Sequence, residues 1–322
     1  MIRVRVCEDI QECARIWEQV WPQQCLFDLW PVRDCFAGSY RRHPYFLVAE
    51  ENGRIEGMLA LSWIEEEQYF AHFPGETWHG KTWLEQNRIP AGSPQVLAAL
   101  LDHVPGPTRL RYLTRDSVPL AERPVGVDEV GYVFYPGEHG YSFEAYMQLF
   151  SGKSRKKLGR ELAQLEAHGV SWRYDHAADI QWLFKTNLES FGESSYFYNP
   201  SFLDSFEKMA IWLHRQGMLR ITAILLGGNI AAVDIGAINA KSYTVLAGGT
   251  NPDFPGVAKM INFHHLERSC RERLEVVDFL CGDFGWKQRF HLTHRPLYEM
   301  TVQPVEAAGQ EAGFYPVHAR EQ

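Results

Sequence analysis

A glycine- and proline-rich stretch at 248–259 has the composition of an anion-binding junction. It reads Gly-Gly-Thr-Asn-Pro-Asp-Phe-Pro-Gly-Val-Ala-Lys, after a predicted strand and directly before a predicted helix. The N–H groups that open a helix lack partners within it and lie at the positive end of its dipole, while glycine allows close approach to the backbone. The stretch therefore predicts a phosphate-binding site, with an ordinary strand-to-helix loop as the alternative. Its candidate residues are Gly248, Gly249, Pro255, Gly256, Val257, Ala258 and Lys259.

A second candidate is a basic run at 153–160, where five of eight residues are Lys or Arg and none is acidic. The run falls at the start of a predicted helix, where the dipole disfavours positive charge, so a bound anion would compensate it. We interpret Lys153, Arg155 and Lys156 as anion-binding residues. A solvated helix face is the alternative, and it is the usual explanation of a charge run.

A third candidate follows an apolar strand at 276–280. The strand gives way at Gly282 to a polar segment that contains Asp283, Trp286 and Lys287. Open α/β sheets carry reactive groups at the ends of their strands. Asp283 could accept a proton and Lys287 could hold an anion or stabilise a developing oxyanion. A surface cluster of ion pairs is the alternative.

Aromatic residues mark a possible acceptor pocket, for which Tyr196, Tyr198 and Trp286 are the candidates. The long aromatic loop at 72–83 could cover such a pocket between the two halves of the chain, or pack against the first half. Histidines at 264, 265, 291 and 294 do not have the spacing of a zinc site, so we interpret them as structural.

Composition narrows the class of protein. The 322 residues carry a formal charge of −8, which disfavours a general binder of DNA. The charge is uneven, because residues 1–140 hold 13 basic against 20 acidic side chains and the remainder hold 19 against 20. The six cysteines lack zinc spacing, no apolar run could span a membrane, and the N-terminus does not resemble a signal peptide. We expect reduced thiols and a cytoplasmic location.

The two halves have the same predicted order of elements, β-α-α-β-β-β-loop-α-β, with hairpin turns at Asn52-Gly53 and Gly227-Gly228. We place the first domain at 1–140, the second at 141–302 and a tail at 303–322. A helix is predicted from Ser154, as its N-cap, to Gly169.

This order resembles two tandem GNAT (N-acetyltransferase) folds, an α/β class with mixed sheets flanked by helices. The part from Leu149 to Val302 is similar to the acetyltransferase domain of the CelD/FemAB-like branch. The similarity rests on the basic helix start, on the segment 225–232, on Pro255-Gly256, and above all on one motif. That motif runs from Asp278 to Phe290, close to the branch pattern DF-x-x-G-D/E-x-x-Y/W-K-x-x-F.

The resemblance implies an acyltransferase that moves an acyl group from acyl-CoA, as co-substrate, to an amine-bearing acceptor. The acceptor would be a small molecule or a cell-envelope precursor, and no permanent cofactor or metal is expected. No motif of a nucleophilic Ser or Cys is present, so direct attack is the expected mechanism. The 248–259 stretch lacks the usual Gln/Arg-x-x-Gly-x-Gly/Ala pattern, which leaves two alternatives: a FemAB-like transferase that uses aminoacyl-tRNA, or a non-catalytic protein that binds a nucleotide or glycan precursor.

Overall fold

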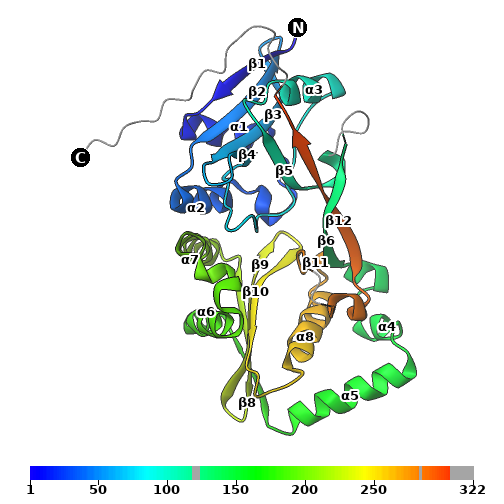
Figure 1. The fold of residues 1–322 in the computed structure, drawn as a ribbon. Helices are drawn as coiled ribbons and strands as arrows, with labels where there is room; N and C mark the ends of the chain where they lie inside the picture. Colours follow the sequence, from blue (N-terminus) through cyan, green and yellow to red (C-terminus); the bar gives the residue numbers. More distant parts are fainter. Residues whose placement is uncertain (118–123, 283–284, 305–322) are drawn as a thin grey trace, which may run out of the picture.

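The computed structural model describes residues 1–117, 124–282 and 285–304 (Figure 1). The elements of the first half are β1 (Arg3–Cys7), α1 (Ile10–Val20), α2 (Trp30–Tyr40), β2 (Pro44–Glu51), β3 (Arg54–Ile64), β4 (Tyr69–His72), α3 (Pro94–Asp102), β5 (Thr108–Leu113) and β6 (Gly126–Phe134). Those of the second half are α4 (Phe143–Met147), α5 (Gly152–Glu166), β7 (Val170–Tyr174), α6 (Ala178–Phe191), α7 (Pro200–Arg215), β8 (Leu219–Leu226), β9 (Asn229–Asn239), β10 (Ser242–Thr250), α8 (Val257–Arg271), β11 (Val276–Asp278) and β12 (Thr293–Val302). The predicted α/β class with mixed pairing is confirmed.

The described strands form one continuous mixed sheet. Its order is β1-β2-β3-β4-β5-β12-β6-β11-β10-β9-β8-β7. The last strand of each half lies beside the other half: β12 pairs with β5, and β6 pairs with β11. The two strands also pair with each other, antiparallel, in the middle of the sheet. The domain boundary near 140 stays a prediction, but the two sheets that it separates are joined by exchanged strands.

Helices cover both faces of the sheet, so most strands are buried on both sides. In β2, Phe46 and Val48 pack toward α1, whereas Leu47 and Ala49 pack toward α3. This alternation follows from the period of two residues in a strand. The second half repeats the arrangement, with α6 and α7 on one face and α5 and α8 on the other. Figure 1 shows the two sets of helices one above the other.

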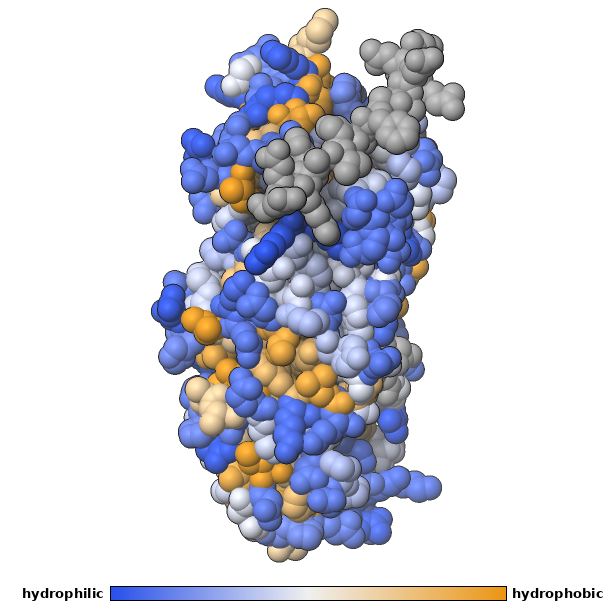
Figure 2. Space-filling model, turned by 60° about the vertical axis from the view of Figure 1, so that its left-hand side comes forward, coloured by the Kyte–Doolittle hydropathy of each residue, from blue (hydrophilic) through white to orange (hydrophobic). Residues whose placement is uncertain are grey.

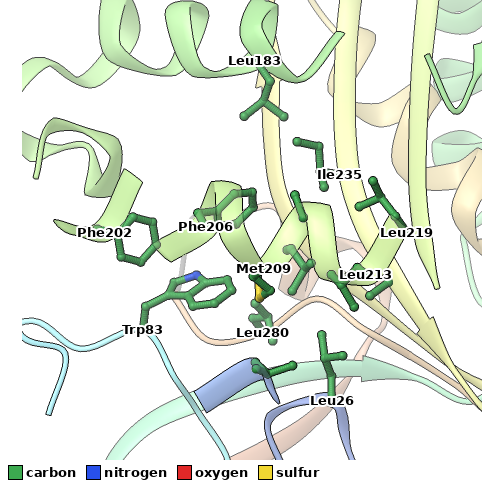
Figure 3. Packing of buried hydrophobic residues seen from close by; sticks show 14 of the residues in the cluster. Leu26, Trp83, Leu183, Phe202, Phe206, Met209, Leu213, Leu219, Ile235 and Leu280 are labelled. Atoms are coloured by element: carbon green, nitrogen blue, oxygen red, sulfur yellow. The ribbon is translucent and has the colours of Figure 1, made fainter. Parts of the chain in front are cut away.

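The halves share a hydrophobic core. Trp83, from the loop before α3, packs edge-to-face against Phe27 and Phe202, with ring centroids 5.4 and 5.5 Å apart, and also contacts Phe206. Figure 3 shows its ring between α7 and the first half. Aromatic burial of this kind is the largest contribution that one side chain makes to a core. The loop is therefore anchored to both halves, as well as covering the space between them.

Several local predictions are confirmed. Asn52 and Gly53 have φ angles of 52° and 76°, as a type I′ turn requires, and they join β2 to β3. The side chain of Ser93 accepts from the N–H of Val96 at the start of α3. The turn at 227–228 joins β8 to β9, as predicted.

Other predictions are corrected. The N-cap of α5 is Ser151, whose Oγ accepts from the N–H of Ser154, so Ser154 lies inside the first turn. The predicted loop at 248–256 is shorter, because Gly248 and Gly249 continue β10 and pair with Asp234 and Val233. The strand β12 is not among the predicted elements, because its apolar positions are few and its pairing is entirely with distant residues.

No helix in the described ranges is both long and apolar enough to cross a membrane. The surface is polar over most of the face in Figure 2, with hydrophobic residues gathered on its lower part, which is the second half of the chain. Phe191, at the end of α6, and Ile211, on α7, are examples of large side chains in this half that remain exposed.

Candidate active site

A cavity of about 520 Å³ lies where the two halves meet. The first half contributes the loop residues 82–85 together with Tyr112 and Glu129. The second half contributes the C-terminal part of β10, the first turns of α8 and the segment 279–287. Elements from both halves therefore surround a single space, which is large enough for a small-molecule site.

One wall of the cavity is an open strand edge. Strand β10 pairs with β11 through Ser242–Thr244, and from there to Thr250 no described strand lies on that side of it. A register shift between Val245 and Ala247 turns this part of the strand. An edge without a neighbouring strand presents N–H and C=O groups to whatever lies beside it. Here the edge faces the cavity.

The start of α8 lies at one end of the same wall. The helix follows Gly256, whose φ of 92° favours glycine, and no side chain caps it. Ala258 lines the cavity, whereas Val257 is buried in the core between α5 and α8. The N–H groups of Val257 and Lys259 already donate to the carbonyls of Phe254 and Gly256, at 3.2 and 2.9 Å. An anion at this helix start would therefore be bound through the N–H of Ala258.

The two glycines of β10 have different roles. A Cβ on Gly248 would lie only 2.4 Å from Oδ1 of Asp234, whose Oδ2 contacts Nε2 of the buried His265 at 2.9 Å. A Cβ on Gly249 would meet only ordinary contacts, at 3.6 Å from Leu183. Gly248 is thus required by the carboxylate of the neighbouring strand, and not only by a ligand.

The predicted donor residues divide between two surfaces. Gly248, Gly249 and Ala258 line the cavity. In contrast, a separate groove of about 520 Å³ beside α5 is lined by Pro255, Gly256 and Lys259. The Lys259 ammonium forms an ion pair with Glu161 on α5, so its charge is already matched.

The predicted anion-binding residues lie elsewhere. Lys153 and Lys156 are exposed on α5, and the guanidinium of Arg155 donates to the Gln148 side chain. None of the three lines the cavity. Figure 1 shows α5 beginning beside α4 and running along the end of the molecule away from the first half. The three predicted anion-binding residues are therefore not part of the cavity, although Lys157 of the same run shares Glu161 with Lys259.

The predicted acceptor residues separate as well. Tyr196 and Trp286 line the cavity, and the Tyr196 hydroxyl donates to the carbonyl of Thr82 at 3.3 Å. Tyr198 does not line it; half of its surface is exposed and its hydroxyl donates to Glu193.

Lys287 is buried beneath the cavity wall. Its ammonium donates to the carbonyls of Phe279, Leu280 and Cys281 at 2.8, 2.9 and 2.8 Å. Burial lowers the pKa of this lysine. These contacts use the three donors of an ammonium group, so in this arrangement Lys287 holds the segment after β11 in place. Its role in catalysis stays a prediction, and Asp283 lies outside the described residues.

The sequence-based prediction did not include Glu85, which lines the cavity from the first half. It is 4% exposed, its Oε1 accepts from the N–H of Cys281 at 2.7 Å, and its Oε2 has no hydrogen-bond partner. Burial raises the pKa of Glu85 to about 7, and the nearby charge of Asp278 acts in the same direction. A carboxyl group with this pKa can exchange a proton near neutral pH.

The exchanged strands hold the neighbours of Glu85. Arg295, on β12, donates a hydrogen bond of 2.9 Å to Asp278, on β11, and forms an ion pair with it at 2.8 Å. The Arg295 side chain crosses β6 at Gly131. A Cβ added to Gly131 would lie 3.2 Å from the guanidinium, so a glycine leaves room for this side chain. The same guanidinium lies 4.0 Å from Oε2 of Glu85. The middle of the sheet therefore fixes a buried group of charges directly behind the cavity.

Only part of this site could have been found from the sequence. The loop at 72–83 is noticeable for its length and its aromatic residues, but Glu85 follows it as one acid among many. Its burial is visible only after Trp83 is placed between the halves. In the described ranges, no group of three or more His, Cys, Asp or Glu residues could hold a metal ion.

Comparisons with known proteins agree with this architecture. Residues 152–288 match the family model described as acetyltransferase (GNAT) domain. No curated protein matches the chain.

Three solved structures share the fold. A conserved protein of unknown function from Bacteroides thetaiotaomicron VPI-5482 has a TM-score of 0.59 at 12% identity, covering 94% of this chain and 100% of its own. FemX has a TM-score of 0.59 at 10% identity, and the match covers 93% of this chain and 97% of FemX. The C-terminal domain of a putative lysylphosphatidylglycerol synthetase from Agrobacterium fabrum has a TM-score of 0.53 at 10% identity. That match covers 86% of this chain and 88% of the domain. Residues 152–288 of this chain therefore form a GNAT acetyltransferase domain.

Proposed function

We propose that the protein transfers an acyl group from a CoA-type thioester to the amine of an acceptor, by direct attack inside the cavity between the halves. One observation carries the proposal. The cavity joins the open edge of β10 and the start of α8, at the side of the second half, to the buried carboxyl group of Glu85, at the side of the first half.

The β10 wall suits the donor. Amide groups of an extended arm can pair with an open strand edge in the way that an added strand does. A diphosphate would lie at the start of α8, against the N–H of Ala258. Gly248 and Gly249 would border the arm. Pro255, Gly256 and Lys259 would contact only a part of the donor that extends into the second groove.

Glu85 suits the role of general base. The neutral amine nitrogen attacks the thioester carbonyl carbon and forms the C–N bond of a tetrahedral intermediate. The intermediate then collapses, the C–S bond breaks and the CoA thiolate leaves. The nitrogen gives up one proton, which Glu85 accepts. N–H groups of the β10 edge would stabilise the oxyanion of the tetrahedral intermediate. The proposed roles of Asp283 and Lys287 are alternatives to be tested beside this one.

The second candidate is transfer of an aminoacyl group from tRNA, as in the FemAB branch. It is favoured by the fold shared with FemX and with a putative lysylphosphatidylglycerol synthetase. The exposed Lys153 and Lys156 offer positive charge for a polyanion. The acidic first half and the limited volume of the cavity favour the smaller donor.

The test compares donors in a single assay. Acetyl-CoA, longer acyl-CoAs and aminoacyl-tRNA are offered with a mixture of amines, and release of free thiol or deacylated tRNA is measured. We expect thiol release with acyl-CoA, reduced about 10²- to 10⁴-fold by Glu85→Gln. Glu138→Gln, which changes an exposed acid outside the cavity, is the matched control. Transfer from tRNA alone would support the second candidate, and full activity of the Glu85→Gln variant would remove Glu85 from the mechanism.

A further inference from the structure

The described lining of the cavity has more acidic than basic side chains. Among the described residues that line the cavity, Glu85, Glu129 and Asp234 are acidic and Lys287 is the one cation. The ammonium of Lys287 is directed at three backbone carbonyls, so it is not presented to a ligand. A phosphorylated acceptor would meet these carboxylates, whereas the nearest guanidinium groups, of Arg111 and Arg295, are hydrogen-bonded to Asp128 and Asp278.

Glu129 is the carboxylate best placed to bind a ligand. It lies on β6, with its side chain 38% exposed, and its Oε1 accepts from the Tyr112 hydroxyl at 3.2 Å. Arg111 is 3.7 Å from Glu129, but its guanidinium is held by Asp128 through three hydrogen bonds of 2.6 to 3.1 Å. The hydrogen bonds that Arg111 makes to carboxylates thus go to the buried Asp128, and Glu129 contacts this guanidinium only at the ion-pair distance of 3.7 Å.

Glu85 and Glu129 act on the same part of the cavity. Burial raises the pKa of Tyr196, and the charges of Glu129 and then Glu85 raise it further. The walls between them are aromatic, with Tyr112, Tyr196 and Trp286 among the lining residues. Aromatic faces and carboxylates together attract ammonium groups. Glu85 adds an independent sign of a missing ligand, since it is buried and its Oε2 has no hydrogen-bond partner.

We propose that the acceptor is a compact diamine or polyamine. Its reacting amine faces Glu85, and a second ammonium group pairs with Glu129. The inference rests on the proposed function, because it assigns the acceptor end of the same cavity. It follows from charge and size. The carboxylates select against acceptors that carry phosphate or carboxylate groups, and the whole cavity of about 520 Å³ also has to hold the acyl end of the donor.

Three acceptors of equal length test the inference. 1,4-Diaminobutane carries a second ammonium group, 4-aminobutan-1-ol a hydroxyl group and 4-aminobutanoate a carboxylate. Binding to the full-length protein is measured by calorimetry, and kcat/KM by CoA release. We expect the diamine to exceed the amino alcohol by about tenfold or more, as one charged hydrogen bond would give, and the carboxylate to be weakest.

Two variants complete the experiment. Glu129→Gln should remove most of the preference for the diamine over the amino alcohol, and Glu138→Gln should keep it. Equal binding of all three amines, tighter binding of the carboxylate, or a full diamine preference in Glu129→Gln would overturn the inference. Selective diamine binding without CoA release from any acyl-CoA would uphold the inference about the ligand and reject the proposed reaction.

Discussion

The two halves contain equivalent strand–loop–helix junctions that are used in opposite ways. In the first half, α3 begins with Pro94, which has no N–H, and the Ser93 side chain caps the next turn. The loop before it fills the space beside β5, where the N–H of Asn87 donates to the carbonyl of Tyr112 and Asn87 accepts from Thr114. In the second half, α8 begins at Gly256 without a side-chain cap, and the edge of β10 is open.

The difference shows how one architecture can serve two purposes. In the first half, the chain itself occupies the space that the second half leaves for a ligand. The loop that fills it also carries Trp83 into the shared core and Glu85 to the cavity. The first half therefore acts on the site of the second by supplying a carboxyl group, which a comparison of element order alone would not reveal.

The largest effect on stability should come from the anchor of this loop. Trp83→Ala removes an almost fully buried ring, so we expect a loss of about 3–5 kcal/mol in the free energy of unfolding. Urea unfolding followed by circular dichroism measures it. Trp78→Ala, in the same loop but only partly buried, should cost clearly less. Equal losses would mean that Trp83 does not join the halves.

The pH dependence of the free energy of unfolding should distinguish Glu85 from an ordinary surface acid. The pKa of Glu85 in the folded protein, about 7, lies above its ordinary value of 4.5, so folding takes up a proton at pH values between the two. The wild type should therefore lose stability, relative to Glu85→Gln, as the pH rises through this range, by about 1–3 kcal/mol above pH 7. The two proteins should agree near pH 4. Thermal unfolding across pH gives the difference, and parallel curves would place the Glu85 pKa near its ordinary value.

The same protonation predicts the rate profile. Because only ionised Glu85 can accept a proton, kcat/KM should rise with pH through about 7. A profile without a change in this range would point to another base, and Asp283→Asn would then be the variant to compare.

A smaller effect should distinguish the two glycines of β10. Gly248→Ala forces the Asp234 carboxylate to move, which we expect to cost about 1–3 kcal/mol, as overpacking does. Gly249→Ala, on the next residue of the same strand, should change stability by less than about 0.5 kcal/mol. Chemical unfolding of both variants checks the contrast. Similar losses would show that Asp234 moves easily.

The smallest expected effect concerns the two helix starts. Ser93→Ala should cost about 1 kcal/mol of stability, since it removes the cap of α3, and should leave the affinity for CoA unchanged. Gly256→Ala introduces a Cβ at a φ of 92°, so it should lower the stability and also weaken the binding of CoA. A thermal-shift titration with CoA measures both properties. Loss of CoA binding in Ser93→Ala would contradict the division of roles between the halves.

Much of the local structure could be predicted from short segments of the sequence. The turn at Asn52-Gly53, the cap at Ser93 and the helix after Gly256 depend on φ angles and hydrogen bonds within a few residues, so their residue types are enough to predict them. The acyltransferase resemblance was likewise visible in the motif around Trp286, because its residues are contiguous.

Tertiary structure alone decided the rest. The exchange of β6 and β12 depends on pairings between residues more than a hundred positions apart, which no local pattern encodes. The pKa of Glu85 depends on burial by both halves and on the charge of Asp278. Likewise, the basic run on α5 looked like part of the donor site until its distance from the cavity was known. Burial and proximity are properties of the assembled sheet, and they determine which of many acids and lysines can take part in the reaction.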